Sequence, residues 1–193
     1  MSGHPKILAF AGATRSQSWN KKLIRVAARA AEEAGAEVTL IDLRDYPMPL
    51  YDGDLEQAEG LPPMARELKA LMVASHAFLL SCPEYNSSIS SVLKNTVDWI
   101  SRPQAGEPRY VAFKGKIAGL ISASPTNLGG VRALITVRQV LSTLGVLVLP
   151  TQFALAHAAS AFNEDGTLKE DGHRAAITAV VAEVCAITTR LLP

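Results

Sequence analysis

Cysteine is scarce in this chain, and its scarcity excludes several kinds of protein. Only Cys82 and Cys185 occur among 193 residues. They form no metal-ligand spacing, so neither a metal site nor a disulfide framework is expected. The chain also has no opening segment in which positive charge precedes a short apolar core, as in a secretion signal. We therefore expect a cytoplasmic protein with reduced thiols.

Long apolar runs and an excess of one charge are also missing. Every apolar run is shorter than the roughly 20 residues that a transmembrane helix needs, so no membrane insertion is expected. Nineteen Lys and Arg residues against 18 Asp and Glu give a net charge of +1. Without a basic stripe, nucleic acid is not an expected partner. The length and the 48% of hydrophobic residues predict a single domain over residues 1–193.

Short apolar runs alternate with longer segments of helical period along the chain. This alternation is typical of βαβ units around a parallel sheet that is buried on both faces. We expect an α/β, doubly wound, five-stranded parallel sheet with helices on both faces. The expected strands are 7–11, 38–41, 77–80, 117–121 and 146–149, and the expected helices are 21–34, 63–75, 91–101, 130–144 and 172–192. Residues 44–62 and 151–171 are expected to be long irregular connections.

Three polar segments follow predicted strands. They cover residues 12–20, 82–88 and 122–130. In open parallel sheets, ligands bind outside the carboxyl ends of the strands. The three segments should therefore meet in one binding site.

The first of these segments has the groups that bind a phosphate. Arg15 supplies a guanidinium, Ser18 a hydroxyl and Asn20 an amide, and a helix start supplies free backbone N–H groups. The same residue types also cap helices without any ligand. Neither G-x-G-x-x-G nor the Walker A pattern is present. On this segment alone, phosphate binding and simple capping both remain open.

The other two segments suit a flat ligand. Tyr85 offers an aromatic face, and Asn86 could hydrogen-bond the edge of a planar ring. An exposed turn would use the same residues. Gly129 and Gly130 permit close backbone approach, although an ordinary helix entry needs no more than that.

Taken together, the motifs resemble the NAD(P)H-dependent FMN reductase family, the flavodoxin-like group that includes bacterial quinone, chromate and azo reductases. The resemblance spans nearly the whole chain. Residues 12–23 are similar to the family's phosphate loop, and residues 83–86 with 93–99 are similar to its flavin-ring motif. Ala13 departs from the usual serine, and residues 124–128 are less rich in glycine than is typical.

The resemblance implies a flavodoxin-like sheet in the order 2-1-3-4-5 and a single FMN-binding site. It assigns the FMN phosphate to Arg15, Ser18 and Asn20, the ribityl chain and isoalloxazine to Pro83, Glu84, Tyr85 and Asn86, and the flanks of the pocket to Ser124 and Gly129. It further implies NADPH or NADH as co-substrate and a ping-pong cycle that ends on a quinone, azo, metal-oxyanion or flavin acceptor. A homodimer or homotetramer is also implied.

Several alternatives remain at this stage. We nominate no side chain as a catalytic acid or base, because the chemistry belongs to the cofactor. An electron-carrying flavodoxin is disfavoured, since such carriers are strongly acidic and have a Thr-rich phosphate loop. A receiver-type signalling domain would need acidic residues where Gly12 and Ala13 stand. An FMN-binding redox sensor or scaffold without useful turnover stays open.

Two single residues each have two possible roles. Cys82 could lie near the flavin or be a small buried hydrophobe, and Trp99 could meet a partner subunit or pack inside the chain.

Overall fold

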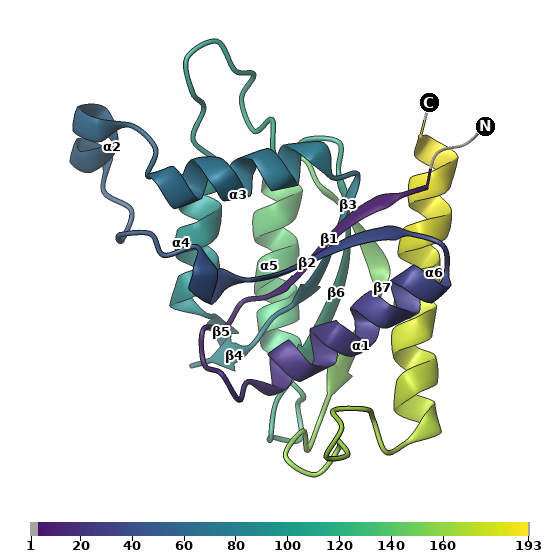
Figure 1. Cartoon of the computed structure of the whole chain (residues 1–193). Coiled ribbons are helices and arrows are strands. Elements are labelled where there is room, and N and C mark those ends of the chain that lie inside the picture. The colour runs from purple at the N-terminus through teal and green to yellow at the C-terminus, as the bar shows by residue number, and fades with distance from the viewer. Residues whose placement is uncertain (1–3, 193) are drawn as a thin grey trace.

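A five-stranded parallel sheet forms the centre of the protein, seen in a computed structural model that describes residues 4–192 (Figure 1). Its strands lie in the order β2-β1-β3-β6-β7, which confirms the predicted order once a separate two-stranded hairpin is set aside. The strands are β1 Lys6–Ala11, β2 Glu37–Asp42, β3 Ala77–Ser81, β6 Ile117–Ala123 and β7 Leu147–Leu155, and the hairpin pairs β4 Glu84–Tyr85 with β5 Ser88–Ile89.

Alternate residues of β1 supply two separate cores. Ile7 and Ala9 belong to the core on one face, whereas Leu8 and Phe10 belong to the core on the other, and all four are buried. Side chains of a strand point to opposite faces in turn, so a strand covered on both sides must be apolar throughout. The continuous apolar runs of the sequence follow from this burial.

Helices cover both faces of the sheet (Figure 1). α1 (Trp19–Glu33) and α6 (Asp171–Leu191) cover one face, and α3 (Pro63–Ala74), α4 (Ser91–Ile100) and α5 (Val131–Thr143) cover the other. The apolar stripe of α6, which includes Ile177 and Val184, is buried in the core beside α1 and the sheet. None of the described helices is long and apolar enough to cross a membrane.

The structure corrects the predicted end of the fifth strand and the two segments that were predicted to be irregular. The fifth strand runs to Leu155 rather than stopping at residue 149, because an edge strand tolerates Pro150 and the polar residues after it. The segment predicted to be irregular over 151–171 therefore begins inside a strand. The other segment, 44–62, contains the end of a short 3-10 helix (Leu43–Asp45) and the α-helix α2 (Gly53–Glu59).

β7 forms one edge of the sheet and is irregular along its length. Its register against β6 shifts between Ala118 and Leu120. Arg138 of α5 donates hydrogen bonds to the carbonyl oxygens of Val148 and Leu149, at 3.0 and 2.8 Å. Pro150, next along the strand, has no N–H to donate. Two carbonyl oxygens at this bulge are thus already paired, and one N–H is absent.

Trp99 packs inside the chain, which decides between its two predicted roles. The side chain is completely buried, and its Nε1 donates to the carbonyl oxygen of Pro49 at 2.8 Å. The ring of Tyr51 meets it edge-on, with centroids 5.1 Å apart. The residue ties the segment after β2 to α4.

Candidate active site

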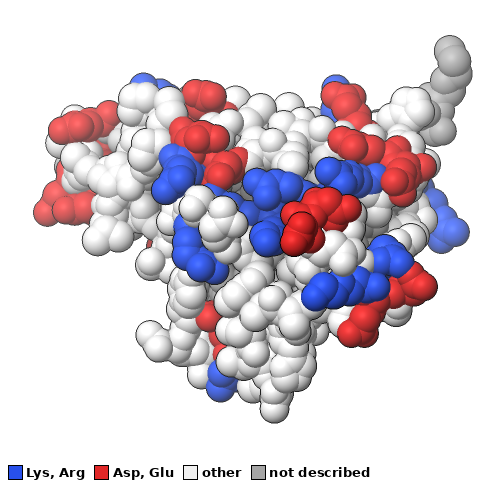
Figure 2. Space-filling model, turned by 60° about the horizontal axis from the view of Figure 1, so that its bottom comes forward, with Lys and Arg blue, Asp and Glu red and all other residues white. Residues whose placement is uncertain are grey.

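The three polar segments meet at the carboxyl edge of the sheet, as predicted. They enclose a hollow of about 380 Å³, within the size range of small-molecule sites. Figure 2 turns this edge of the molecule forward and shows most of the charged side chains in the upper half of the view. The hollow is lined by Arg15, Ser18, Trp19, Asn20, Pro83, Glu84, Tyr85, Ala123, Ser124, Pro125 and Thr126.

Seven of the nine residues predicted for the site line this hollow. The other two, Asn86 and Gly129, do not. Asn86 lies in the turn of the hairpin and lines a neighbouring groove beside α5. Gly129 lies against the backbone of Ala154 and Ala156 at the end of β7. It shapes the loop without reaching the hollow.

Ser18 begins α1 but does not cap it with its side chain. Its backbone has the extended conformation of an N-cap, yet its hydroxyl makes no capping hydrogen bond. By contrast, Asp42, Asp52 and Ser90 each accept a backbone N–H at the helix starts that they cap. The Ser18 hydroxyl and the first N–H groups of α1 are therefore left for a group in the hollow.

Arg15 stands over the ring of Trp19, with its guanidinium carbon 5.2 Å from the ring centroid. Trp19 was not among the predicted site residues, because it occupies a position between Ser18 and Asn20 for which the family motif specifies no residue. Stacking of this kind holds a guanidinium in place while leaving its N–H groups free. Arg15 is exposed at the rim of the hollow.

Asn20 also forms hydrogen bonds that join neighbouring elements of the fold. Its Oδ1 accepts hydrogen bonds from the hydroxyl of Ser81 at 2.9 Å and from the backbone N–H of Ala123 at 3.0 Å. Its Nδ2 donates to the carbonyl oxygen of Ala123 at 2.8 Å. Three elements, α1, β3 and β6, are joined in this way beneath the hollow. One Nδ2 hydrogen remains for a ligand.

Glu84 holds the hairpin against the start of α5. Its carboxylate accepts from the backbone N–H of Arg132 at 3.1 Å and from the Arg132 Nε at 2.6 Å. Arg132 lies in the first turn of α5, where a negative charge is stabilised by the helix dipole. Tyr85, the next residue of the hairpin, is 56% exposed.

The third segment, 122–130, is held by a contact between two of its hydroxyls and by a hydrogen bond to the end of β7. The Ser124 hydroxyl lies 3.0 Å from that of Thr126, and the Ser124 N–H donates to Leu155 at the end of β7. Gly130 begins α5 with a φ of +93°, and a Cβ there would lie 1.9 Å from the Ser122 hydroxyl. The loop is thus compact and close to the sheet.

Cys82 is a buried hydrophobe, in agreement with one of its two predicted roles. It is inaccessible to solvent, and burial raises the pKa of its thiol to about 12. A thiol with such a pKa is not a thiolate nucleophile at neutral pH. Among the residues from 4 to 192, no group of three or more potential metal-ligating side chains occurs.

Comparisons with known proteins agree with this geometry. The family model for NADPH-dependent FMN reductase matches residues 5–160. The chain belongs to this family. It is 35% identical over 175 residues to an NAD(P)H-dependent FMN reductase of Pseudomonas aeruginosa, covering 90% of each chain. It is 33% identical to a quinone reductase of Pseudomonas putida, covering 88% of each.

A solved structure extends the likeness to three dimensions. The reductase superposes on the flavoenzyme NAD(P)H:(acceptor) oxidoreductase FerB from Paracoccus denitrificans with a TM-score of 0.81 and 26% identity, over 98% of this chain and all of the other. The flavodoxin-like fold is therefore confirmed. The reductase is an oxidoreductase of the NAD(P)H-dependent FMN and quinone reductase type.

An ion pair between a buried lysine and a partly exposed aspartate supports the first loop of the reductase. Lys21 is 5% exposed, and its Nζ donates to Asp42 Oδ2 at 2.6 Å and to the carbonyl oxygen of Thr14 at 3.2 Å. Burial by itself raises the pKa of the Asp42 carboxyl, but the hydrogen bonds from Lys21 and from the Arg44 N–H outweigh it and lower the pKa. This pair could not be predicted from the sequence, because Lys21 lies in α1 and Asp42 in β2.

We expect Asp42→Asn to lower the free energy of unfolding at pH 7 by roughly 1 kcal/mol. This is less than the about 3–5 kcal/mol for breaking a fully buried pair, because the Asp42 side chain is 34% exposed. A lowered pKa in the folded state stabilises the protein above the ordinary carboxyl value of 3.8, and this contribution is lost as the pH falls through the lower, folded value.

Urea unfolding at pH 7 and at pH 3 would measure this effect. The difference between the wild type and Asp42→Asn should be smaller at pH 3. Asp45→Asn is the matched control, because no hydrogen bond or ion pair of the Asp45 side chain is found within residues 4–192. Equal effects of the two substitutions at pH 7 would contradict the role of the Lys21–Asp42 pair.

Proposed function

We propose that the reductase binds FMN in the hollow at the carboxyl edge, with the phosphate at the start of α1. The observation that carries this proposal is the free Ser18 hydroxyl beside uncapped backbone N–H groups. Arg15 adds a positive charge at the rim, and Asn20 adds one amide hydrogen. Hydroxyl, guanidinium and helix N–H groups together are typical of a phosphate site.

The other end of the hollow suits a flat ring. Pro83 and Tyr85 line it from the hairpin, and Ser124 and Thr126 line it from the third segment. Glu84 is paired with Arg132, so we propose that it positions the hairpin in addition to lining the site. Asn86 and Gly129, outside the hollow, would act on the ring through the shape of their loops.

Bound FMN would supply the hydride chemistry between NADPH or NADH and a quinone, azo, metal-oxyanion or flavin acceptor. The residues of the chain would bind and orient first the nicotinamide nucleotide and then the acceptor. Tyr85 remains exposed beside the hollow, where it can flank a planar partner. We assign no side chain as a proton donor or acceptor.

Purification followed by absorption spectroscopy tests this proposal. We expect a yellow protein, or one that takes up FMN, that oxidises NADPH or NADH with a quinone, an azo dye or free FMN as acceptor. A protein that cannot take up FMN would refute the proposal. Uptake of FMN without oxidation of either nicotinamide nucleotide would instead support an electron carrier or redox sensor.

We also propose a homodimer or homotetramer in a reducing, cytoplasmic setting. α6 contributes its apolar stripe to the chain's own core, so the support for an oligomer lies elsewhere. Tyr85, Leu128 and Ile135, near the start of α5, are 56, 47 and 62% exposed. The two thiols are unpaired and buried, as expected in a reducing compartment. Light scattering on the purified protein would give the oligomeric state.

A further inference from the structure

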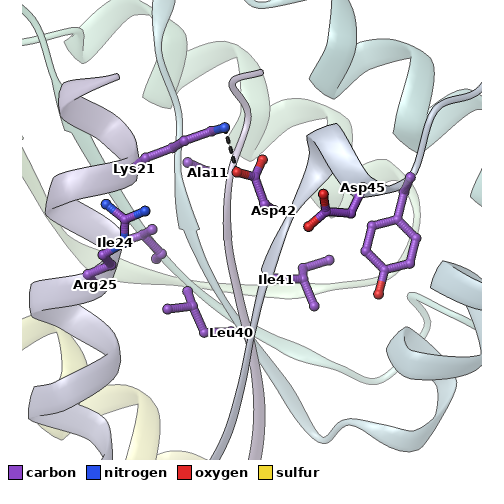
Figure 3. A pocket seen from close by; sticks show the side chains of 9 residues that line it. Ala11, Lys21, Ile24, Arg25, Leu40, Ile41, Asp42 and Asp45 are labelled. Atoms are coloured by element: carbon purple, nitrogen blue, oxygen red, sulfur yellow. Dashed lines mark hydrogen bonds and ion pairs between the residues drawn. The ribbon is translucent and has the colours of Figure 1, made fainter. Parts of the chain in front are cut away.

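A second hollow of about 340 Å³ opens at the carboxyl end of β2, between that strand and α1 (Figure 3). The first loop lies between this hollow and the proposed FMN site. Lys21, which lines the hollow, donates a hydrogen bond to the carbonyl oxygen of Thr14 in that loop. Neighbouring strands lie about 4.8 Å apart, so the end of β2 is one strand away from the end of β1. The two hollows are neighbours along one edge of the sheet.

The walls of this second hollow combine an apolar floor with free charges. Ile24 of α1 and Leu40 of β2 supply the apolar part, and Leu40 is 44% exposed although it is a large aliphatic residue. Ile41 also borders the hollow, but its side chain packs against the core on the other face of the sheet. Arg25 stands on the α1 side and Asp45 on the β2 side (Figure 3). Neither side chain has a hydrogen bond or ion pair within residues 4–192.

We infer that this hollow is a subsite for an adenosine phosphate. The base would lie on the apolar floor beside Leu40, the ribose hydroxyls would donate to the carboxylates of Asp42 and Asp45, and a phosphate would pair with Arg25. In doubly wound folds an acidic residue after the second strand recognises a ribose diol, and a nearby arginine accommodates a 2′-phosphate. The end of β2 places Asp42 in that position.

The inference rests on the proposed function, which brings a nicotinamide nucleotide, and with it an adenosine phosphate, to this edge. A flavin that carries an adenylate beyond its phosphate, as FAD does, would present the same group if it took the place of FMN. Both share the same chemistry at this subsite, and the experiment can tell them apart.

Arg25→Ala tests the subsite, and Arg29→Ala is the matched control. Arg29 is exposed on the same helix one turn further on and does not line the hollow. The probe is adenosine 2′,5′-bisphosphate, titrated calorimetrically into the protein with and without added FMN. We expect Arg25→Ala to weaken binding about ten-fold or more, as for loss of a charge-assisted hydrogen bond. Arg29→Ala should bind as the wild type does.

A second variant, Leu40→Trp, would fill the hollow from an already exposed position on an edge strand, and it should also abolish probe binding. If Arg25→Ala and Leu40→Trp both bind the probe as the wild type does, the inference is overturned. The titration without FMN tests the subsite even if the proposed function is wrong. A failure of the proposed function would instead appear as absence of FMN uptake.

Two further measurements identify the source of the adenosine phosphate. A rise in KM for NADPH in Arg25→Ala, with unchanged relative affinities for FMN and FAD, assigns the subsite to the nicotinamide nucleotide. A loss of FAD affinity relative to FMN, with unchanged KM, assigns it to the flavin. Either result supports the subsite, whereas no change in any of these quantities contradicts it.

Discussion

Replacing Gly129 with alanine is expected to lower the free energy of unfolding by about 3 kcal/mol. Gly129 has a φ of +60°, and a Cβ would lie 2.7 Å from the carbonyl carbon and oxygen of Ala154. The left-handed conformation costs roughly 1–2 kcal/mol for a residue with a side chain, and overpacking against an immobile group costs about 1–3 kcal/mol more. Because the opposing atoms are backbone at the end of β7, they cannot rotate away.

Gly166→Ala separates these two causes. Gly166 has a φ of +82°, but its Cβ would meet nothing within 4 Å. This control should show the conformational cost alone, about 1–2 kcal/mol. Chemical unfolding of the wild type and both variants would measure the difference. Equal losses in Gly129→Ala and Gly166→Ala would show that the close approach to Ala154 has no energetic consequence.

Arg15→Ala is expected to weaken FMN binding about 10- to 100-fold while leaving the melting temperature of the apoprotein unchanged. A charge-assisted hydrogen bond contributes roughly 1.5–3 kcal/mol, and an exposed loop arginine contributes little to the core. Riboflavin has the same ring system but lacks the phosphate. Its affinity should therefore change much less than that of FMN.

Arg109→Ala is a close control for this substitution. Arg109 is also exposed and stacks on an aromatic ring, that of Tyr110, with its guanidinium carbon 4.7 Å from the centroid. It does not line the hollow. Quenching of flavin fluorescence would give both affinities. If Arg15→Ala weakened FMN and riboflavin binding equally, Arg15 would not be the phosphate ligand.

The central strands could be predicted from the sequence because burial on both faces leaves continuous apolar runs, as in 77–80. The end of β7 could not be predicted, since its exposed residues and Pro150 resemble a loop. α2 was missed for a similar reason. It buries none of its residues, so it has no apolar period to detect.

The site was predictable where its residues are adjacent in sequence. The first loop and the hairpin carry their chemistry within a few positions, and both line the hollow. Contacts between distant residues could not be foreseen: Glu84 and Arg132 are 48 positions apart, and Lys21 and Asp42 are 21 apart. The second hollow was hidden because Arg25 and Leu40 fit ordinary helix and strand patterns.

The bulged edge of β7 limits how copies of this protein can associate. A sixth strand added there would find no amide hydrogen on Pro150, and the carbonyl oxygens of Val148 and Leu149 are already bonded to Arg138. Exposed strand edges with free backbone groups are templates for polymerisation, and irregular edges block it. Pairing of another strand with residues 148–150 is therefore disfavoured, and subunits that meet at this part of the edge must do so through side chains.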